Sequence, residues 1–329
     1  MHPMKRLLAG LIASLGVAGT AQANIEFVFD YSHDTNNVMT ADMKNLLELA
    51  AGTLEARITD ELAAIGPQGD FAPNIFFTPP DTGSSASAVN TIGANQIYVY
   101  VGGRELPDAP SLTISGVAKL ATRPASVPGN DPDYLAYRDE LRTRGQAGAL
   151  DNPASDYAPW GGSIAFNTLS SFYVDDDIST LESFEGQYDF YTVALRSLIG
   201  ILGYGVGGSA SAADSFADQV DPENLEFTGG NAVAEFGGNV PLYYDVETEG
   251  GDDRFLDNGV MSSVDGVAQE ALMTYNIGTN ERRSVSDLDY AILKDIGWQV
   301  AAPVPEPAGY AMLLAGLGLV GAIARGRRG

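Results

Sequence analysis

Ser32, His33 and Asp34 bring the residue types of a hydrolytic triad together in three consecutive positions. In such a triad the serine is the nucleophile, the histidine its base, and the acid orients the histidine. The three residues follow a predicted strand, and consecutive residues of an extended segment point alternately to opposite faces. We therefore expect no catalytic relay at this place.

Acidic residues crowd at two places, Asp175-Asp176-Asp177 and Asp252-Asp253. Carboxylate oxygens are the hard ligands that calcium prefers. The first run lacks the spacing of an EF-hand loop, and a solvated loop explains it as well. If these residues bind a cofactor, we expect it to be calcium.

A third stretch, Phe190 to Gly205, reads FYTVALRSLIGILGYG. Its apolar residues recur at helical spacing and glycines follow, which predicts a buried helix that ends in a glycine turn. Residues four apart on a helix share one face, where two side chains can hold one metal ion. Arg196 and Gly200 occupy two such positions, and Ser197 follows the first.

This stretch resembles the active-site helix of the metzincin and matrixin zinc metallopeptidases, which typically reads VALHEIGHALGFG. The resemblance places Arg196 at the first histidine, Ser197 at the catalytic glutamate and Gly200 at the second histidine. Arginine is permanently cationic, glycine has no side chain, and serine cannot replace the glutamate as general base. The resemblance therefore implies a degenerate metallopeptidase scaffold that lacks the HExxH ligands.

The histidine count points the same way. The chain has two histidines, His2 and His33, so it cannot supply three imidazoles to a zinc ion. Val206 stands where the longer metzincin pattern has its third ligand, and the downstream loop 245–257 contains no histidine. We expect no catalytic residues and no zinc.

Carboxylates could take over either of two tasks in such a domain. Asp252, Asp253 or Glu270 could ligate a metal, which would leave an active metallopeptidase with unusual ligands. Alternatively, Asp252 or Asp253 could pair with Arg196, so that an ion pair replaces the metal as the tie between helix and downstream loop. A solvent-exposed Arg196 is equally compatible with the sequence, because only a buried arginine needs an acidic partner.

Three further segments resemble the metzincin group, in the same order along the chain. Residues 227–233 resemble the segment before the third-ligand loop, and Ser284 to Trp298 resembles the closing helix. Glu270-Ala271-Leu272-Met273 resembles the Met-turn. Met273 is therefore the candidate Met-turn methionine, with Met261 as the second candidate.

The N-terminal residues predict export. Residues 1–23 contain the basic pair Lys5-Arg6, an apolar run and the small-x-small end Ala21-Gln22-Ala23. These are the parts of a signal peptide, and we expect the mature chain to begin near Asn24. An uncleaved membrane anchor is the alternative.

The C-terminal residues 303–329 resemble the PEP-CTERM sorting signal of Gram-negative bacteria that make exopolysaccharide. They contain Pro305-Glu306-Pro307, an apolar segment at 308–324 and a terminal arginine cluster. The resemblance implies transient anchoring of segment 308–324 in the inner membrane, cleavage by an exosortase, and delivery to the cell surface or the extracellular matrix. A permanent single-span anchor is the alternative.

Composition narrows the range of partners. The chain has 18 basic and 43 acidic residues, a net charge of −25, and no cysteine. So acidic a surface repels nucleic acid phosphates, which excludes DNA and RNA as partners. Without cysteine there are no disulfides and no thiolate nucleophiles. The expected partners are an exosortase, the membrane through the C-terminal segment, and an exopolysaccharide or a protein ligand.

The order of predicted elements is that of an α+β domain at 24–302. The elements are strands at 24–31, 74–77, 96–101 and 160–167 and helices at 41–65, 189–202, 210–218 and 287–296. Residues 122–159 are a predicted insertion with a local helix at 132–144, and 219–256 are predicted to be mostly loop. We expect a metzincin-like domain with a twisted mixed sheet, a central helix and a loop-rich C-terminal part.

These patterns together predict an exported, non-catalytic, metallopeptidase-like protein of the cell surface or exopolysaccharide matrix. An active metallopeptidase with carboxylate ligands is one alternative. A calcium-stabilised adhesin or matrix protein is the other.

Overall fold

The structure of the chain is a computed structural model. It describes residues 24–88, 91–107, 109–116, 119–151, 154–175, 177, 178, 180, 182–206, 215–245 and 250–302, with the backbone alone for 119, 245 and 250–252. The predicted signal peptide, the sorting motif Pro305-Glu306-Pro307 and the apolar segment 308–324 lie outside the described residues. Within those residues, no helix has the length and apolar character needed to cross a membrane.

A four-stranded sheet lies at the centre of the described residues, in the order β1-β4-β7-β5. Strands β1 (Glu26–Asp30), β4 (Gln96–Arg104) and β7 (Gly161–Asn167) run parallel, and β5 (Ser111–Gly116) is an antiparallel edge strand. Every residue of β7 is buried, as expected for an inner strand with both faces covered. The predicted α+β class and the mixed sheet are confirmed.

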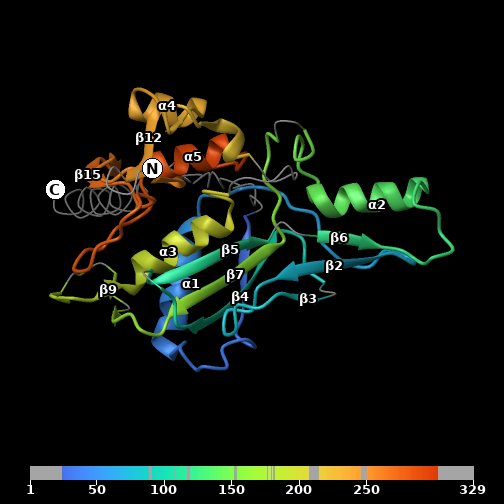
Figure 1. Cartoon of the computed structure of the whole chain (residues 1–329), viewed down its shortest axis with the longest axis horizontal. Coiled ribbons are helices and arrows are strands. Elements are labelled where there is room, and N and C mark those ends of the chain that lie inside the picture. Colours follow the sequence, from blue (N-terminus) through green and yellow to red (C-terminus); the bar gives the residue numbers. More distant parts are fainter. Residues whose placement is uncertain are drawn as a thin grey trace, which may run out of the picture.

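Two helices pack on each other beside this sheet, α1 (Ala41–Glu55) and α3 (Phe190–Ile201) (Figure 1). Thr40 caps α1 by accepting a hydrogen bond from the Met43 amide, as predicted. The predicted extension of this helix to residue 65 is wrong. It ends at Glu55 because residues 57–60 turn away and pair with the end of the domain, where the Thr59 amide donates to the Gln299 carbonyl.

A second sheet, in the order β3-β2-β6, extends to one side of the first (Figure 1). It consists of β2 (Ala72–Phe77), β3 (Ala86–Ala88) and β6 (Lys119–Thr122), and helix α2 (Pro132–Thr143) packs on β6. Helix α2 confirms the helix predicted at 132–144.

Arg144, which follows α2, ties this side region to the central sheet. Its side chain is fully buried, and its guanidinium donates to the carbonyls of Ala63, Gln96 and Pro159 at 2.9, 2.9 and 3.0 Å. Burial lowers the pKa of Arg144 to about 10. The predicted insertion therefore contributes an internal contact to the domain.

The C-terminal half contains more regular structure than the loop predicted at 219–256. A second four-stranded sheet is formed by β10 (Val220–Asp221), β11 (Glu226–Phe227), β12 (Val240–Asp245) and β13 (Gly250–Leu256), and α4 (Gly230–Phe236) lies between its strands in the sequence. The loop prediction failed because β10 and β11 are too short to show alternation, and because β13 begins with glycines and aspartates, which are depleted in strands. Of the helix predicted at 210–218, the described part contains a short 3-10 helix at Ala217–Gln219.

The remaining elements complete this half. Strands β14 (Met261–Val264) and β15 (Val267–Glu270) form a hairpin, and β8 (Phe172–Tyr173) pairs with β9 (Tyr188–Asp189). The last helix, α5 (Asp287–Asp295), confirms the helix predicted at 287–296. Its N-terminus is a capping box in which Ser286 and Asp289 each bind the other's backbone amide.

Two carboxyl groups lie where the end of the domain meets the end of α1. Asp60 is 1% exposed, and its Oδ2 accepts a hydrogen bond from the Gln299 amide at 2.8 Å. Asp156 packs against Gly297, whose positive φ of 111° and close neighbours leave no room for a side chain. Burial raises the pKa of Asp60 to about 6, and burial together with the charge of Asp60 raises the pKa of Asp156 to about 7.

Stability should therefore fall as the pH rises. In the unfolded chain both carboxyls ionise near their ordinary pKa of 3.8, whereas the folded domain keeps its protons up to about pH 6 and 7. The folded state is thus favoured below about pH 4, and this contribution, about 1–2 kcal/mol after solvent screening, is lost as the pH rises to about 7. Urea unfolding of wild type and of Asp156→Asn from pH 4 to 8 measures it. The variant should show a flatter profile, and the exposed-site control Asp70→Asn should keep the wild-type slope; equal slopes for all three chains would contradict the assignment.

Candidate functional site

Helix α3 is positioned from its N-terminus. Asp189 caps it, accepting hydrogen bonds from the amide and hydroxyl of Thr192 at 2.9 and 2.7 Å. Arg282 donates to the same carboxyl group through Nε and Nη2 at 3.0 and 2.9 Å, and both side chains are almost fully buried. This charged pair joins the start of α3 to the segment before α5. The helix ends at Ile201, and Gly203 follows with a positive φ of 98°. The glycine turn predicted after this helix is therefore present.

Arg196, which the resemblance places at the first metzincin histidine, binds the carbonyls of one turn of the chain. Its Nη1 donates to the carbonyls of Leu272, at 2.9 Å, and Thr274, and its Nη2 donates to the carbonyl of Tyr275 at 3.0 Å. The guanidinium carbon also lies 4.5 Å from the centre of the Phe255 ring, a cation–π distance. The arginine thus links α3 to the 272–275 turn and to β13.

The same turn is held from its other side by Asp289. This carboxyl group is fully buried and accepts hydrogen bonds from the amides of Leu272 and Met273 at 2.9 and 3.1 Å. The peptide unit between Leu272 and Met273 therefore directs its carbonyl to Arg196 and its N–H to Asp289. Burial raises the pKa of Asp289, and the hydrogen bonds that it accepts oppose this rise.

Sequence reasoning identified the turn but missed Asp289. Met273, the predicted Met-turn residue, is 2% exposed within the core, whereas the second candidate Met261 is 52% exposed. The available signal was the capping-box spacing of Ser286 and Asp289. That spacing marks the start of a helix, but it does not say that the acid also reaches another segment.

Ser197 and Gly200 face the edge strand β5. Ser197 Oγ lies 2.8 Å from the Val193 carbonyl, to which it donates, and 3.0 Å from the hydroxyl of Ser111. A Cβ at Gly200 would lie 3.1 Å from Thr113 Cγ2. A side chain at 200 would therefore contact Thr113 closely, and the threonine side chain would have to shift by a few tenths of an ångström.

The acids proposed as substitute ligands are placed differently from one another. The carboxylate of Glu270 contacts other residues than those of α3. Its Oε2 forms an ion pair with Arg283 at 2.8 Å, and its Oε1 accepts a hydrogen bond from the Gly259 amide. Asp253 is exposed. The side chain of Asp252 lies outside the described residues, so a pair between it and Arg196 stays a prediction.

The acidic run is a loop held by local hydrogen bonds. Asp175 accepts hydrogen bonds from the Asp177 amide at 3.1 Å and the Tyr173 hydroxyl at 2.9 Å, and these bonds lower the pKa of Asp175. The Tyr173 oxygen also lies 2.5 Å from Glu182. Asp176 lies outside the described residues. Among those residues, no three His, Cys, Asp or Glu side chains are grouped so that they could hold a metal ion.

Within Ser32-His33-Asp34, the side chains of His33 and Asp34 have different partners. Asp34 accepts the amides of Val38 and Met39, both at 3.0 Å, and so closes the loop after β1. The carboxyl group that faces His33 belongs to Asp81, with Nδ1 and Oδ1 3.8 Å apart.

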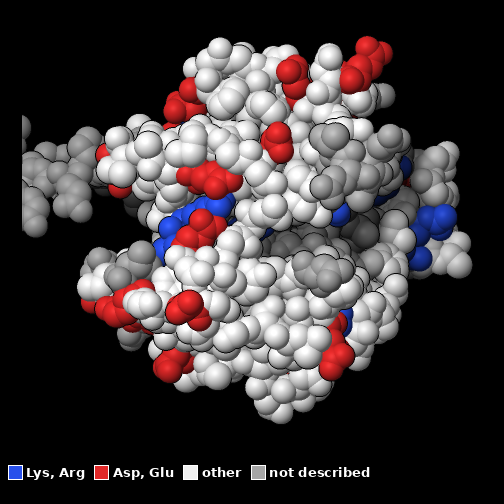
Figure 2. Space-filling model, turned by 60° about the vertical axis from the view of Figure 1, so that its left-hand side comes forward, with Lys and Arg blue, Asp and Glu red and all other residues white. Residues whose placement is uncertain are grey.

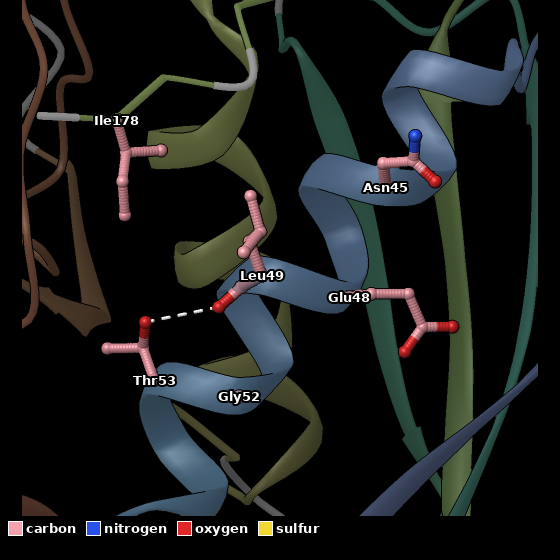
Figure 3. Close-up of a pocket in the computed structure, with 6 residues that line it drawn as sticks. All are labelled: Asn45, Glu48, Leu49, Gly52, Thr53 and Ile178. Atoms are coloured by element: carbon pink, nitrogen blue, oxygen red, sulfur yellow. Dashed lines mark hydrogen bonds between the residues drawn. The ribbon is translucent and has the colours of Figure 1, made fainter. Parts of the chain in front are cut away.

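An open groove lies along the exposed side of α1 (Figure 3). It has a volume of about 630 Å³ and is lined by Asn45, Glu48, Leu49, Gly52, Thr53 and, from the loop after β8, Ile178. The side chains of Leu49 and Ile178 are 42% and 39% exposed. Nothing lies within 4 Å of a Cβ built at Gly52. The groove thus offers both apolar and hydrogen-bonding groups to a partner.

The surface charge is unevenly distributed (Figure 2). On the face shown, Asp and Glu side chains are scattered over the surface, and Lys and Arg side chains lie mainly at mid-height, in a stretch beside acidic side chains and in a group at the right-hand edge. Acidic side chains are thus spread more widely than basic ones on this face.

Comparison with known proteins adds one family match, to the end of the chain. Residues 303–328 match the PEP-CTERM protein-sorting motif, so the predicted motif Pro305-Glu306-Pro307 is confirmed. Neither the curated proteins nor the solved structures contain a match to the chain. The chain is thus an exported protein that carries a signal recognised by an exosortase, and its sorting leads to the cell surface. The metzincin resemblance of the main domain therefore rests on its sequence motifs alone.

Arg196 and Asp289 bind opposite ends of the Leu272–Met273 peptide unit, so we expect substitution of either residue to lower stability. Arg196→Met removes the donors to three turn carbonyls, and Asp289→Asn weakens the acceptor of two turn amides. Each should lower the free energy of unfolding by about 1–3 kcal/mol, because partly buried backbone groups lose their partners. Urea unfolding at fixed pH measures both losses.

The double variant tests whether the two side chains act on the same turn. Once one has released the turn, the other has less to hold, so the double variant should lose at least about 0.5 kcal/mol less than the sum of the single losses. Arg138→Met, which removes a half-exposed arginine from α2, is the matched control and should change stability little. Additive losses would show that the turn does not couple the two residues.

Proposed function

We propose that the domain at 24–302 is a non-catalytic, metzincin-like binding module of the cell surface or exopolysaccharide matrix, to which its sorting motif delivers it. The observation that carries this proposal is the role of Arg196. A permanently charged side chain occupies the first ligand position and is committed to the carbonyls of Leu272, Thr274 and Tyr275. A metallopeptidase needs an electron-pair donor at that position.

The packing around α3 supports the metzincin-like part of the proposal. The central helix lies beside a mixed sheet, Met273 is buried in the core near it, and α5 follows as the closing helix. Arg196 also links α3 to the downstream part of the chain, the structural task that a zinc ion performs in the enzymes. The scaffold can therefore persist without the ion.

Metal content and peptidase activity test the proposal directly. The purified full chain should contain well below one zinc per molecule after exposure to zinc, and it should not cleave casein, while a zinc metallopeptidase assayed in parallel does. The physical reason is that position 196 holds a cation and position 200 packs against Thr113. Stoichiometric zinc with cleavage that a chelator abolishes would establish the alternative, an active enzyme with carboxylate ligands.

Thermal unfolding of the same samples separates the remaining alternative. The proposed module should unfold at the same temperature with and without calcium or zinc. A rise with calcium and none with zinc would instead identify a calcium-stabilised adhesin or matrix protein, with Asp175 and Asp177 as the first residues to substitute.

The groove on α1 is the surface proposed for the partner, because it presents apolar side chains next to an amide, a carboxylate and a hydroxyl. Leu49→Asp, which places a second charge beside Glu48, should weaken co-sedimentation with purified exopolysaccharide of the host by at least about tenfold. Leu169→Asp, at a side chain that is 70% exposed outside the groove, is the control and should bind like wild type. Wild type that binds the polysaccharide no more than the Leu49→Asp variant would exclude this partner and leave a protein ligand.

A further inference from the structure

The last described residues of the chain are fastened to the end of α1. The Thr59 amide donates to the Gln299 carbonyl at 2.9 Å, and the Ala301 amide donates to the Arg57 carbonyl at 2.7 Å. Ile58 and Val300 form the bridge between these bonds.

Side chains add to this backbone pairing. Arg57 Nε donates to the Ala301 carbonyl at 3.2 Å, and the Gln299 amide donates to Asp60. Trp298 is 3% exposed and donates through Nε1 to the Leu202 carbonyl at the end of α3. The chain is thus part of the fold up to Ala301.

The sorting signal begins almost at once after this attachment. The match to the PEP-CTERM motif starts at residue 303, and Pro305 is four residues beyond Ala301. An extended chain spans at most about 3.5 Å per residue, so Pro305 can lie no more than about 14 Å from Ala301. A protein domain is wider than that, so an enzyme that reads Pro305-Glu306-Pro307 works close to the folded domain.

Release of the attachment would lengthen the tether, but at a cost to the fold. It would break the hydrogen bonds of residues 299 and 301 and expose Ile58, which is fully buried, and Trp298. The surface around the attachment is also suited to a second protein. Glu61, Gln299 and Ala302 are exposed there, so a carboxylate and an amide lie beside the exit of the chain.

We propose that residues 57–61 and 298–301, here called the junction surface, form a docking surface for the exosortase, which contacts it while the attachment stays intact. The exosortase thereby recognises the folded domain together with the motif. This inference rests on the sorting motif and on the attachment, and it is independent of the function proposed for the rest of the domain.

Site-specific photo-crosslinking in cells that contain the exosortase tests the contact. A crosslinking amino acid at Glu61 or Gln299 should capture the enzyme, as should one at Ala302, which borders the motif and serves as the positive control. The matched negative control is Leu169, which follows the carboxyl end of β7, whereas the junction surface lies near Asn95, before the start of the parallel strand β4. Yields at 61 and 299 at least fivefold above that at 169 are expected. Capture from 302 alone would overturn the proposal.

A longer tether provides a second arm that leaves the fold untouched. Eight Gly and Ser residues inserted between Ala301 and Ala302 keep Ala302 beside the motif and free both from the junction surface. The crosslinks from 61 and 299 should then fall several-fold, while the one from 302 persists. Unchanged yields at 61 and 299 would mean that the short tether does not cause the contact, contrary to the proposal.

A disulfide distinguishes docking from release of the attachment. The chain has no cysteine, so Ile58→Cys with Val300→Cys introduces a single pair at bridge partners, where the geometry suits a disulfide. If the exosortase docks on the intact attachment, the oxidised and reduced variants should give crosslinks from Ala302 within twofold of each other. Loss of this crosslink on oxidation, with recovery on reduction, would show that the attachment must open and would overturn the proposal.

Discussion

The peptide unit between Leu272 and Met273 is the point on which the C-terminal half of the structure depends. Its carbonyl faces the guanidinium of Arg196, and its N–H faces the buried carboxyl group of Asp289. A buried charge is tolerated only where hydrogen bonds replace its hydration. The peptide N–H contributes to this for the fully buried Asp289, while the peptide carbonyl accepts a hydrogen bond from the partly buried Arg196. Helices α3 and α5 are thereby fixed to one turn of the chain.

On the metzincin-like interpretation proposed above, this arrangement explains how α3 keeps its surroundings without metal ligands. Removal of a metal leaves its neighbours without a common partner, whereas an arginine has five N–H donors in a fixed plane and can bind several carbonyls. Arg196 reaches three of them. The close approach of Thr113 to Gly200 then closes the other side of the helix.

The sorting signal directly follows the folded part of the chain at the C-terminal end of the domain. The sorting motif follows the last paired residue, Ala301, within a few residues. The charge of −25 suits a protein that is released into water and kept away from anionic surfaces. Asp60 and Asp156 lie where the chain leaves the fold. Their protonation therefore affects the same contacts that attach the C-terminal segment to the domain.

The sequence by itself determined the features that depend on local patterns. Helical spacing and the residues Thr40 and Ser286 placed α1, α3 and α5, and the order of motif, apolar run and arginines identified the sorting signal. Only the tertiary structure decided what depends on partners distant in the chain. It ended α1 at Glu55, because residues 57–60 pair with residues 299–301, and it formed strands in a region without visible alternation. It also gave Arg196 its partners, because the hydrogen bonds of an arginine to backbone carbonyls leave no trace in the identity of the residues that supply them.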